Sequence, residues 1–168
     1  ADARRRDVTI NALFEDPRTG EVIDFVDGRR DLDARLLRAI GEPEDRFEED
    51  RLRMLRAVRF GARFGLEIDH RTLEAITRRA DRLGAVSRER VGQELRRMLE
   101  HPSRAVVARL AERMGLDHSI LGAPRSGDES DRSRLASLPE EEISWIDALI
   151  AWELDRGTGS NPDAMTRL

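Results

Sequence analysis

Side chains suited to nucleotide chemistry gather in one stretch, EEDRLRMLRAVRFGARFG, residues 48–65. An acid and three arginines recur there at every third position, as Asp50, Arg53, Arg56 and Arg59. On one helix each such step turns about 300°, so the four would form a slanted ridge. Carboxylates accept hydrogen bonds and guanidinium groups donate them in a rigid fork, which suits a phosphate or a base edge. A solvated, salt-bridged helix face is the alternative, and spacing alone does not decide between the two.

A second set of such side chains stands near the start of the chain, in RRDVTINA. Arg5, Arg6 and Asp7 precede a predicted helix that also carries Asn11. An acid at a helix start is often only a cap, favoured there by the helix dipole. The functional interpretation is that Asp7 accepts from a ribose hydroxyl while an arginine contacts phosphate.

Thiolate metal sites and disulfides are excluded, because the chain has no cysteine. The three histidines, His70, His101 and His118, stand apart from one another, and we expect them at surface or cap positions rather than on a metal. The acids Asp31 and Asp33 form a D-x-D pair, for which a solvated turn or helix start is the preferred interpretation.

Periodicity predicts a small α/β piece followed by helices. Helices are expected over 4–14, 44–64, 69–84, 87–101, 103–116 and 139–157, and strands over 21–26 and 35–41. We expect residues 122–134 to form a mobile loop and the last eleven residues to fray. In the long helix, Leu52, Leu55, Val58 and Phe60 form an apolar stripe at helical spacing, and the set Leu52, Leu55, Val58 and Ala62 should face the core. Trp145 and Trp152 lie seven residues apart, which favours core packing over base stacking.

The overall composition does not indicate a basic nucleic-acid binder. The chain has 168 residues and a formal net charge of -4, and all 30 of its basic residues are arginine. Arginine without lysine is typical of GC-rich codon usage, so only the positions of the arginines carry functional information. A locally basic face on an acidic protein is still compatible with RNA binding. No apolar run approaches the roughly 20 residues of a membrane span.

The order and density of these motifs resemble a known family. RRD followed by TINA, the linker DLDARLLRAIGEPEDRFEED and the EDxxR motif are similar to the bacterial-type (class II) tRNA nucleotidyltransferases, which are CCA-adding enzymes, and to the related poly(A) polymerases. The resemblance covers residues 4 to about 115. It implies a mainly α fold, with the C-terminal α/β remnant of a nucleotidyltransferase head over 1–41, a helical neck over 42–116, and a loop with the start of a helical body over 117–168.

The resemblance also implies roles for single residues. Arg5, Arg6 and Asp7 match the motif that handles ribose and triphosphate, with Asn11 beside it. Glu49, Asp50 and Arg53 match EDxxR, whose side chains present hydrogen-bonding groups to the base edge in place of a template. The further nucleotide-binding arginines of the family fall on Arg56 and Arg59. RNA contacts are expected from two arginine pairs, Arg78 with Arg79 and Arg96 with Arg97, for which solvated helix arginines are the alternative.

The implied reaction is addition of C and A to tRNA 3′ ends from CTP and ATP, in the cytoplasm. The implied cofactor is Mg²⁺, held by an upstream Gly-Ser and D-x-D of the same protein's head domain. Asp31 and Asp33 are not expected to be these metal ligands, because they fall in the linker with no Gly-Ser before them. We therefore expect no catalytic or metal-binding residue in the present chain, and we expect the chain to be inactive alone. A poly(A) polymerase and a non-catalytic RNA-binding module are the alternatives, and a helix-turn-helix DNA binder is disfavoured.

Overall fold

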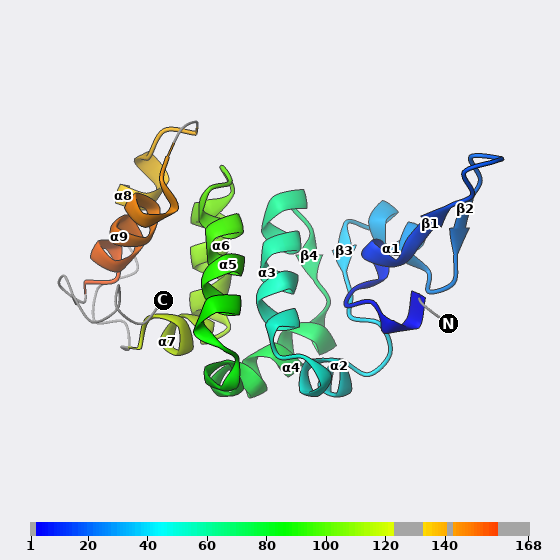
Figure 1. The fold of residues 1–168 in the computed structure, drawn as a ribbon, viewed down its shortest axis with the longest axis horizontal. Helices are drawn as coiled ribbons and strands as arrows, with labels where there is room; N and C mark the ends of the chain where they lie inside the picture. The colour runs from blue at the N-terminus through cyan, green and yellow to red at the C-terminus, as the bar shows by residue number, and fades with distance from the viewer. Residues whose placement is uncertain (1–2, 123–132, 141–142, 158–168) are drawn as a thin grey trace. The chain divides into compact units, whose positions relative to one another are not determined.

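The computed structural model describes residues 3–122, 133–140 and 143–157. The chain divides into two compact units, Ala1–Arg78 and Arg79–Leu168. The described residues are mainly helical, as predicted (Figure 1). Most of the expected loop at 122–134 and the expected frayed end fall outside the described residues.

The start of the first unit is not the single helix predicted over 4–14. It forms two short 3₁₀ turns, η1 (Ala3–Arg5) and η2 (Thr9–Ala12), and then strand β1 (Leu13–Glu15). β1 pairs antiparallel with β2 (Val22–Asp24), which confirms in shorter form the strand predicted over 21–26. The β-branched residues Val8, Thr9 and Ile10 disfavour a regular α-helix, and Phe14 instead lies opposite Ile23 in the hairpin.

Helix α1 (Gly28–Asp33) follows the hairpin, and Asp24 accepts hydrogen bonds from its first two N–H groups. The Asp24 carboxylate accepts hydrogen bonds from the backbone N–H groups of Val26, Gly28 and Arg29. These bonds, the one from Arg29 most of all, lower the pKa of Asp24. Gly28 packs directly on η2, where an added Cβ would overlap the carbonyl of Thr9. Close packing at Gly28 thus fixes α1 against η2, the turn that directly follows the RRD motif.

The predicted helix over 44–64 is two helices, α2 (Pro43–Glu49) and α3 (Leu52–Phe64). Asp50 between them has an extended backbone, with φ −152° and ψ 105°. Its carboxylate accepts from the backbone N–H of Leu52 at 3.2 Å, which satisfies an N–H that the start of a helix leaves without a partner. The prediction of one continuous helix was therefore wrong, because an Asp that hydrogen-bonds its own backbone competes with helix continuation.

The core of the first unit lies between α3 and a short parallel sheet. Strand β3 (Leu36–Leu37), which confirms the strand expected over 35–41, pairs with β4 (Glu67–Ile68). Helix α4 (His70–Arg79) follows at once. All four residues expected to face the core, Leu52, Leu55, Val58 and Ala62, are buried. They pack in a core that also contains Leu37, Phe47, Met54, Ile68 and Ile76.

A polar network links the α/β segment to α4. Asp31 is 3% exposed and accepts from the Thr9 hydroxyl at 2.7 Å and from Arg38 Nε at 3.2 Å. Arg38 also lies 3.7 Å from Asp69, whose other oxygen caps α4 by accepting from Thr72. The hydroxyl of Thr72 accepts in turn from the N–H of Ala39. Asp31 is thus a buried structural residue, and the expectation that it is solvated was wrong.

The second unit is helical. It contains η3 (Ala80–Ala85), α5 (Arg88–Leu99), α6 (Arg104–Arg113), α7 (Leu116–Leu121), α8 (Ser133–Ser137) and α9 (Trp145–Asp155). The predicted helix over 69–84 therefore ends early and continues as a 3₁₀ turn. The predicted helix over 139–157 begins only at Trp145, where the Ser144 hydroxyl accepts from the N–H of Ile146. The sequence did not predict α7 and α8.

Buried polar contacts join α9 to the helices before it. Arg156, fully buried, donates to Asp117 at 2.8 Å. Trp152 is 1% exposed, and its indole N–H donates to Glu112 at 2.8 Å, which confirms core packing for this tryptophan. Trp145 is only half-buried. The chain from α6 to α9 is consequently held by ion pairs and hydrogen bonds as well as by apolar packing.

Candidate nucleotide site

The two motifs singled out in the sequence meet in the first unit through Asp7 and Arg56. Arg56 Nε donates to Asp7 Oδ2 at 2.6 Å, although the residues are 49 positions apart. The other carboxylate oxygen of Asp7 accepts from the N–H of Val8 at 3.0 Å and from the Asn11 amide at 2.9 Å. Asp7 is 6% exposed, whereas the Arg56 side chain is 31% exposed. The structure therefore brings Asp7, Asn11 and Arg56 together.

The charge of Asp7 is set by two opposing effects. Burial of the carboxyl favours the neutral acid, but the hydrogen bonds from Asn11, Arg56 and Val8, with the positive charge of Arg56, outweigh it and lower the pKa of Asp7. Asp7 is therefore an anion at neutral pH. A carboxylate has about four acceptor sites, and three are used here, so one remains for a further donor.

Arg53 lies one turn before Arg56 and also reaches the first motif. Its guanidinium donates to Glu49 at 2.7 Å, to the carbonyl of Arg46 at 3.3 Å and to the carbonyl of Arg5 at 3.3 Å. Its side chain is 17% exposed. Arg53 is consequently held in one orientation by α2 and by the RRD segment together.

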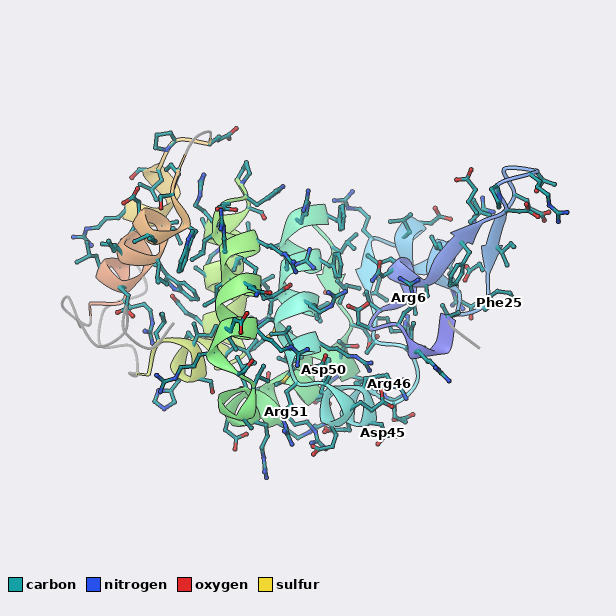
Figure 2. The ribbon with its side chains drawn as sticks, in the orientation of Figure 1. Arg6, Phe25, Asp45, Arg46, Asp50 and Arg51 are labelled. Carbon is teal, nitrogen blue, oxygen red and sulfur yellow. The ribbon has the colours of Figure 1, made fainter. Side chains whose placement is uncertain are left out.

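Asp50 does not belong to the predicted ridge, because it lies at the break before α3 rather than on the helix. It stays near Arg53, whose backbone N–H donates to the carbonyl of Asp50 at 3.1 Å. The break takes Asp50 out of the helical register, so Asp50 and Arg53 both lie near the first turn of α3. Figure 2 labels Asp50 together with its neighbours Arg46 and Arg51.

Arg59 and Arg6 lie against aromatic rings. The guanidinium of Arg59 lies 4.4 Å from the ring centre of Phe60, and Arg56 lies 5.6 Å from the same ring. Arg6 lies 5.5 Å from the ring centre of Phe14. No part in nucleotide or RNA binding was predicted for the phenylalanines. The signal that was missed is the spacing of four residues between Arg56, Phe60 and Phe64.

Three of the four arginines expected to contact RNA are exposed and take part in ion pairs. Arg78 lies 2.8 Å from Glu44, Arg96 lies 2.8 Å from Glu100, and Arg97 lies 3.4 Å from Glu94. Arg79 is half-buried. The pairs of Arg78 and Arg96 have solvent-accessible partners and are worth little in stability, whereas the Glu94 partner of Arg97 is buried. The side chains of Arg78, Arg96 and Arg97 are themselves exposed, so a phosphate can reach them.

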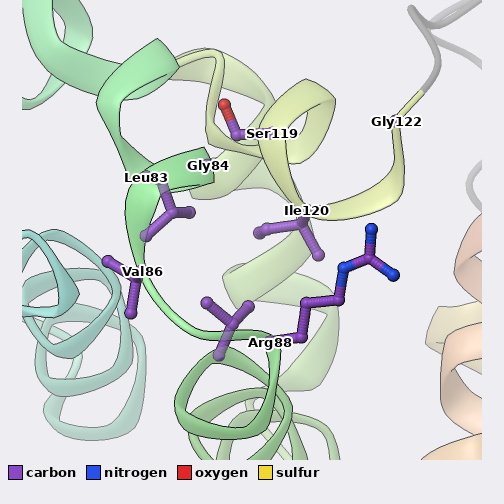
Figure 3. Close-up of a pocket in the computed structure, with 8 residues that line it drawn as sticks. Leu83, Gly84, Val86, Arg88, Ser119, Ile120 and Gly122 are labelled. Carbon is purple, nitrogen blue, oxygen red and sulfur yellow. The ribbon is translucent and has the colours of Figure 1, made fainter. Parts of the chain in front are cut away.

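The second unit has a pocket of about 190 Å³ between η3, α5 and α7. Leu83, Val86 and Ile120 line it, and Arg88 lies at its edge (Figure 3). The hydroxyl of Ser119, another lining residue, donates to the carbonyl of Ala80. None of the residues predicted to bind the nucleotide or RNA lines this pocket, so we assign it no role in the site.

The residues present do not fit a divalent metal. Over the described residues, no three His, Asp or Glu side chains gather so that they could hold an ion. Asp31, one of the D-x-D acids, is already engaged by Thr9 and Arg38. No metal-dependent step is therefore derived for this chain. Nor does any helix of the described part have the length and apolar character needed to cross a membrane.

Known proteins are similar to this chain in sequence and in fold. A family model of the poly A polymerase head domain matches residues 1–38, and one of the probable RNA and SrmB-binding site of polymerase A matches residues 65–124. The CCA-adding enzyme of Lactiplantibacillus plantarum is 37% identical over 160 residues, which cover 92% of this chain and 38% of that protein. That of Bacillus subtilis is 44% identical over 99 residues, covering 59% and 25%.

A solved structure agrees with these matches. The crystal structure of the Bacillus stearothermophilus CCA-adding enzyme in complex with CTP is 37% identical, with a TM-score of 0.69, and the match covers 81% of this chain and 33% of that one. The fold is thus that of a mainly α nucleotidyltransferase region with a head-domain segment before it. The chain belongs to the family of bacterial-type CCA-adding enzymes and poly(A) polymerases. It spans 25% and 38% of the two curated relatives described above.

Proposed function

We propose that this chain supplies the ribose and base recognition of a template-independent RNA nucleotidyltransferase that adds C and A to tRNA 3′ ends. The observation that carries the proposal is the pair formed by Asp7 and Arg56, which joins the RRD segment to α3. It places the groups suited to ribose, phosphate and base within one unit. The names of the relatives support CCA addition rather than polyadenylation.

The base edge is assigned to Asp50 and Arg53. Arg53 offers a planar fork of donors and Asp50 offers acceptors, a combination that can match the edge of C or of A. Glu49 acts through Arg53, since its carboxylate holds the guanidinium at 2.7 Å. The orientation of Arg53 is thus fixed before a nucleotide arrives, which reduces the ordering cost of binding.

The ribose and phosphates are assigned to the other half of the site. The remaining acceptor site of Asp7 suits a ribose hydroxyl, with Asn11 holding the carboxylate in place. The side chains of Arg5 and Arg6 are exposed and those of Arg56 and Arg59 partly so, which leaves their charges available to a triphosphate. The proposed substrates are ATP, CTP and the tRNA 3′ end. The proposal also requires Mg²⁺ and an upstream head domain.

RNA binding by the helices is supported by the family model over residues 65–124. The exposed arginines Arg78, Arg96 and Arg97 are the candidates for backbone phosphates, together with Arg79. The borders proposed between head and neck at residue 41, and between neck and body at residue 116, remain predictions.

The test is a chimera in which this chain replaces the matching segment of the Lactiplantibacillus plantarum relative. The substrate is tRNA lacking its 3′ CCA, with CTP and ATP supplied separately and together. Addition of C from CTP, and of A only after C, is the expected result. Repeated A addition from ATP alone would favour a poly(A) polymerase. Binding of tRNA by a folded chimera without any incorporation would favour a non-catalytic RNA-binding module.

A further inference from the structure

Two phenylalanines on α3 form a stacked pair at the surface of the first unit. The rings of Phe60 and Phe64 are 6.1 Å apart between centres, with an interplanar angle of 9°. Phe64 is 51% exposed and Phe60 is half-buried. Neither ring belongs to the buried core, so apolar burial within the unit does not account for an exposed parallel pair of this kind.

Positive charges flank the two rings. Arg56 and Arg59 both lie over Phe60, at 5.6 Å and 4.4 Å. Arg63, next to Phe64, is exposed, and its side chain makes no hydrogen bond or ion pair with the described residues. We call Arg56, Arg59, Phe60, Arg63 and Phe64 the aromatic strip. It alternates rings and guanidinium groups along one side of α3.

The charge of α3 favours nucleic acid as the partner. From Leu52 to Phe64 the helix has four arginines and no acid, although the whole chain has a formal net charge of -4. Aromatic faces next to arginines are suited to unpaired bases joined by phosphates, because any base can stack on a ring while a guanidinium binds the backbone. Bases in a duplex are stacked on one another and cannot use such a surface.

We propose that the aromatic strip binds the unpaired 3′-terminal nucleotides of the RNA, with a base on the exposed ring of Phe64 and a backbone phosphate at Arg63. Arg56 and Phe64 are eight residues apart, about 12 Å along a helix. A stacked strand advances about 3.4 Å for each nucleotide, so the strip accommodates roughly three. One end of the strip is the Arg56–Asp7 pair, so the RNA end reaches the proposed nucleotide site. That the RNA 3′ end points toward Asp7 rests on the proposed function, whereas the presence of a stacking surface does not.

The experiment measures binding of the 168-residue chain to a fluorescein-labelled single-stranded RNA ending in CC-3′, by fluorescence anisotropy. Phe64→Leu is expected to weaken binding by about fivefold to a hundredfold. Phe64→Trp should retain it, because tryptophan also stacks on a base. Arg63→Gln is expected to reduce the slope of log K against log salt by about 0.7, the value for one phosphate contact with a single strand.

Matched controls lie elsewhere in the same unit. Phe25 is 66% exposed and packs edge-on against Phe14, so Phe25→Leu removes an equivalent exposed ring. Arg30→Gln on α1 makes the same charge change at an exposed position. Neither variant should alter RNA binding. Thermal unfolding of each variant shows whether the fold is retained.

Wild-type RNA affinity in a folded Phe64→Leu variant would overturn the proposal. So would an equal loss in Phe25→Leu, or duplex RNA binding as tightly as the single strand. Failure of the proposed function has a different signature. If Arg53→Ala leaves base choice in the chimera unchanged while Phe64→Leu still weakens RNA binding, the base-reading assignment fails and the stacking surface stands.

Discussion

Arg56 donates from Nε to a carboxylate oxygen of Asp7 at 2.6 Å, and this contact joins two segments that lie 49 residues apart in the sequence. The pair has a structural and a functional consequence. It fixes the RRD segment on α3, and it keeps Asp7 ionised in a buried position. The first prediction separates these two effects by pH.

Asp7→Asn should lower the free energy of unfolding at pH 7 and reduce its dependence on acid pH. The pKa of Asp7 is lower in the folded chain than in the unfolded chain, so its contribution is fully present above about pH 4 and is lost as the pH falls through the folded value. Urea unfolding of both proteins from pH 7 to pH 3 measures this. The difference between them should shrink in acid. A constant difference would mean that the Asp7 charge contributes nothing to stability.

Base choice should depend on Asp50 and Arg53. In the chimera with the Lactiplantibacillus plantarum relative, Asp50→Ala or Arg53→Ala should disturb selection between C and A more than triphosphate affinity. The cost is roughly 1–3 kcal/mol, by analogy with bidentate base contacts. Misincorporation with single nucleotides measures it. Unchanged order of C and A addition in both variants would count against the templating assignment.

Nucleotide affinity should depend on Arg56 and Arg59. Arg56→Gln and Arg59→Gln are expected to raise KM for CTP and ATP several-fold or more in the same chimera. Arg71→Gln is the control, because Arg71 also pairs with an acid, Glu42 at 2.6 Å, but lies on α4. Equal KM increases in all three variants would indicate general electrostatics instead of a site.

The chain by itself should not transfer nucleotides in the presence of Mg²⁺. Its described residues hold no group of acids able to bind the ions that activate a 3′-hydroxyl. The assay is incorporation of labelled CMP or AMP into tRNA lacking CCA. Labelled product from the purified 168-residue chain would refute this prediction.

Stability of the second unit should depend strongly on one ion pair. Asp117→Ala removes the carboxylate from the fully buried Arg156 and should cost about 3–5 kcal/mol. Glu48→Ala breaks the exposed pair with Arg51 at 2.9 Å and should cost less than about 1 kcal/mol. Urea unfolding compares the two. Similar small losses would show that Arg156 is stabilised mainly by its other surroundings.

Much of this molecule could be predicted from its sequence. The mainly α fold, the strands near 21–26 and 35–41 and the core face of α3 all follow from periodicity and local chemistry. Asp7, Asn11 and Arg56, which the sequence singles out, do meet, and Arg53 contacts the carbonyl of Arg5. Their assigned roles remain predictions.

The features missed depend on tertiary contacts or on local competition. Nothing in the spacing of Asp50 shows that its carboxylate accepts from Leu52 and interrupts the helix. Asp31 looked solvated because its partners, Thr9 and Arg38, lie 22 and 7 residues away. The stacking of Phe60 on Phe64 was hidden because Phe60 also fitted an apolar stripe.

The buried contacts of Asp31 bear on how the protein can be divided by engineering. The network passes from Thr9 through Arg38 to Asp69, so it crosses residue 41, where the sequence suggests a boundary between head and neck. A cut at that point would leave Asp69 and Thr72 on one piece without Arg38 and Ala39 on the other. Residues 1–78, which form one compact unit, should therefore be kept together when this part of the protein is moved into a relative.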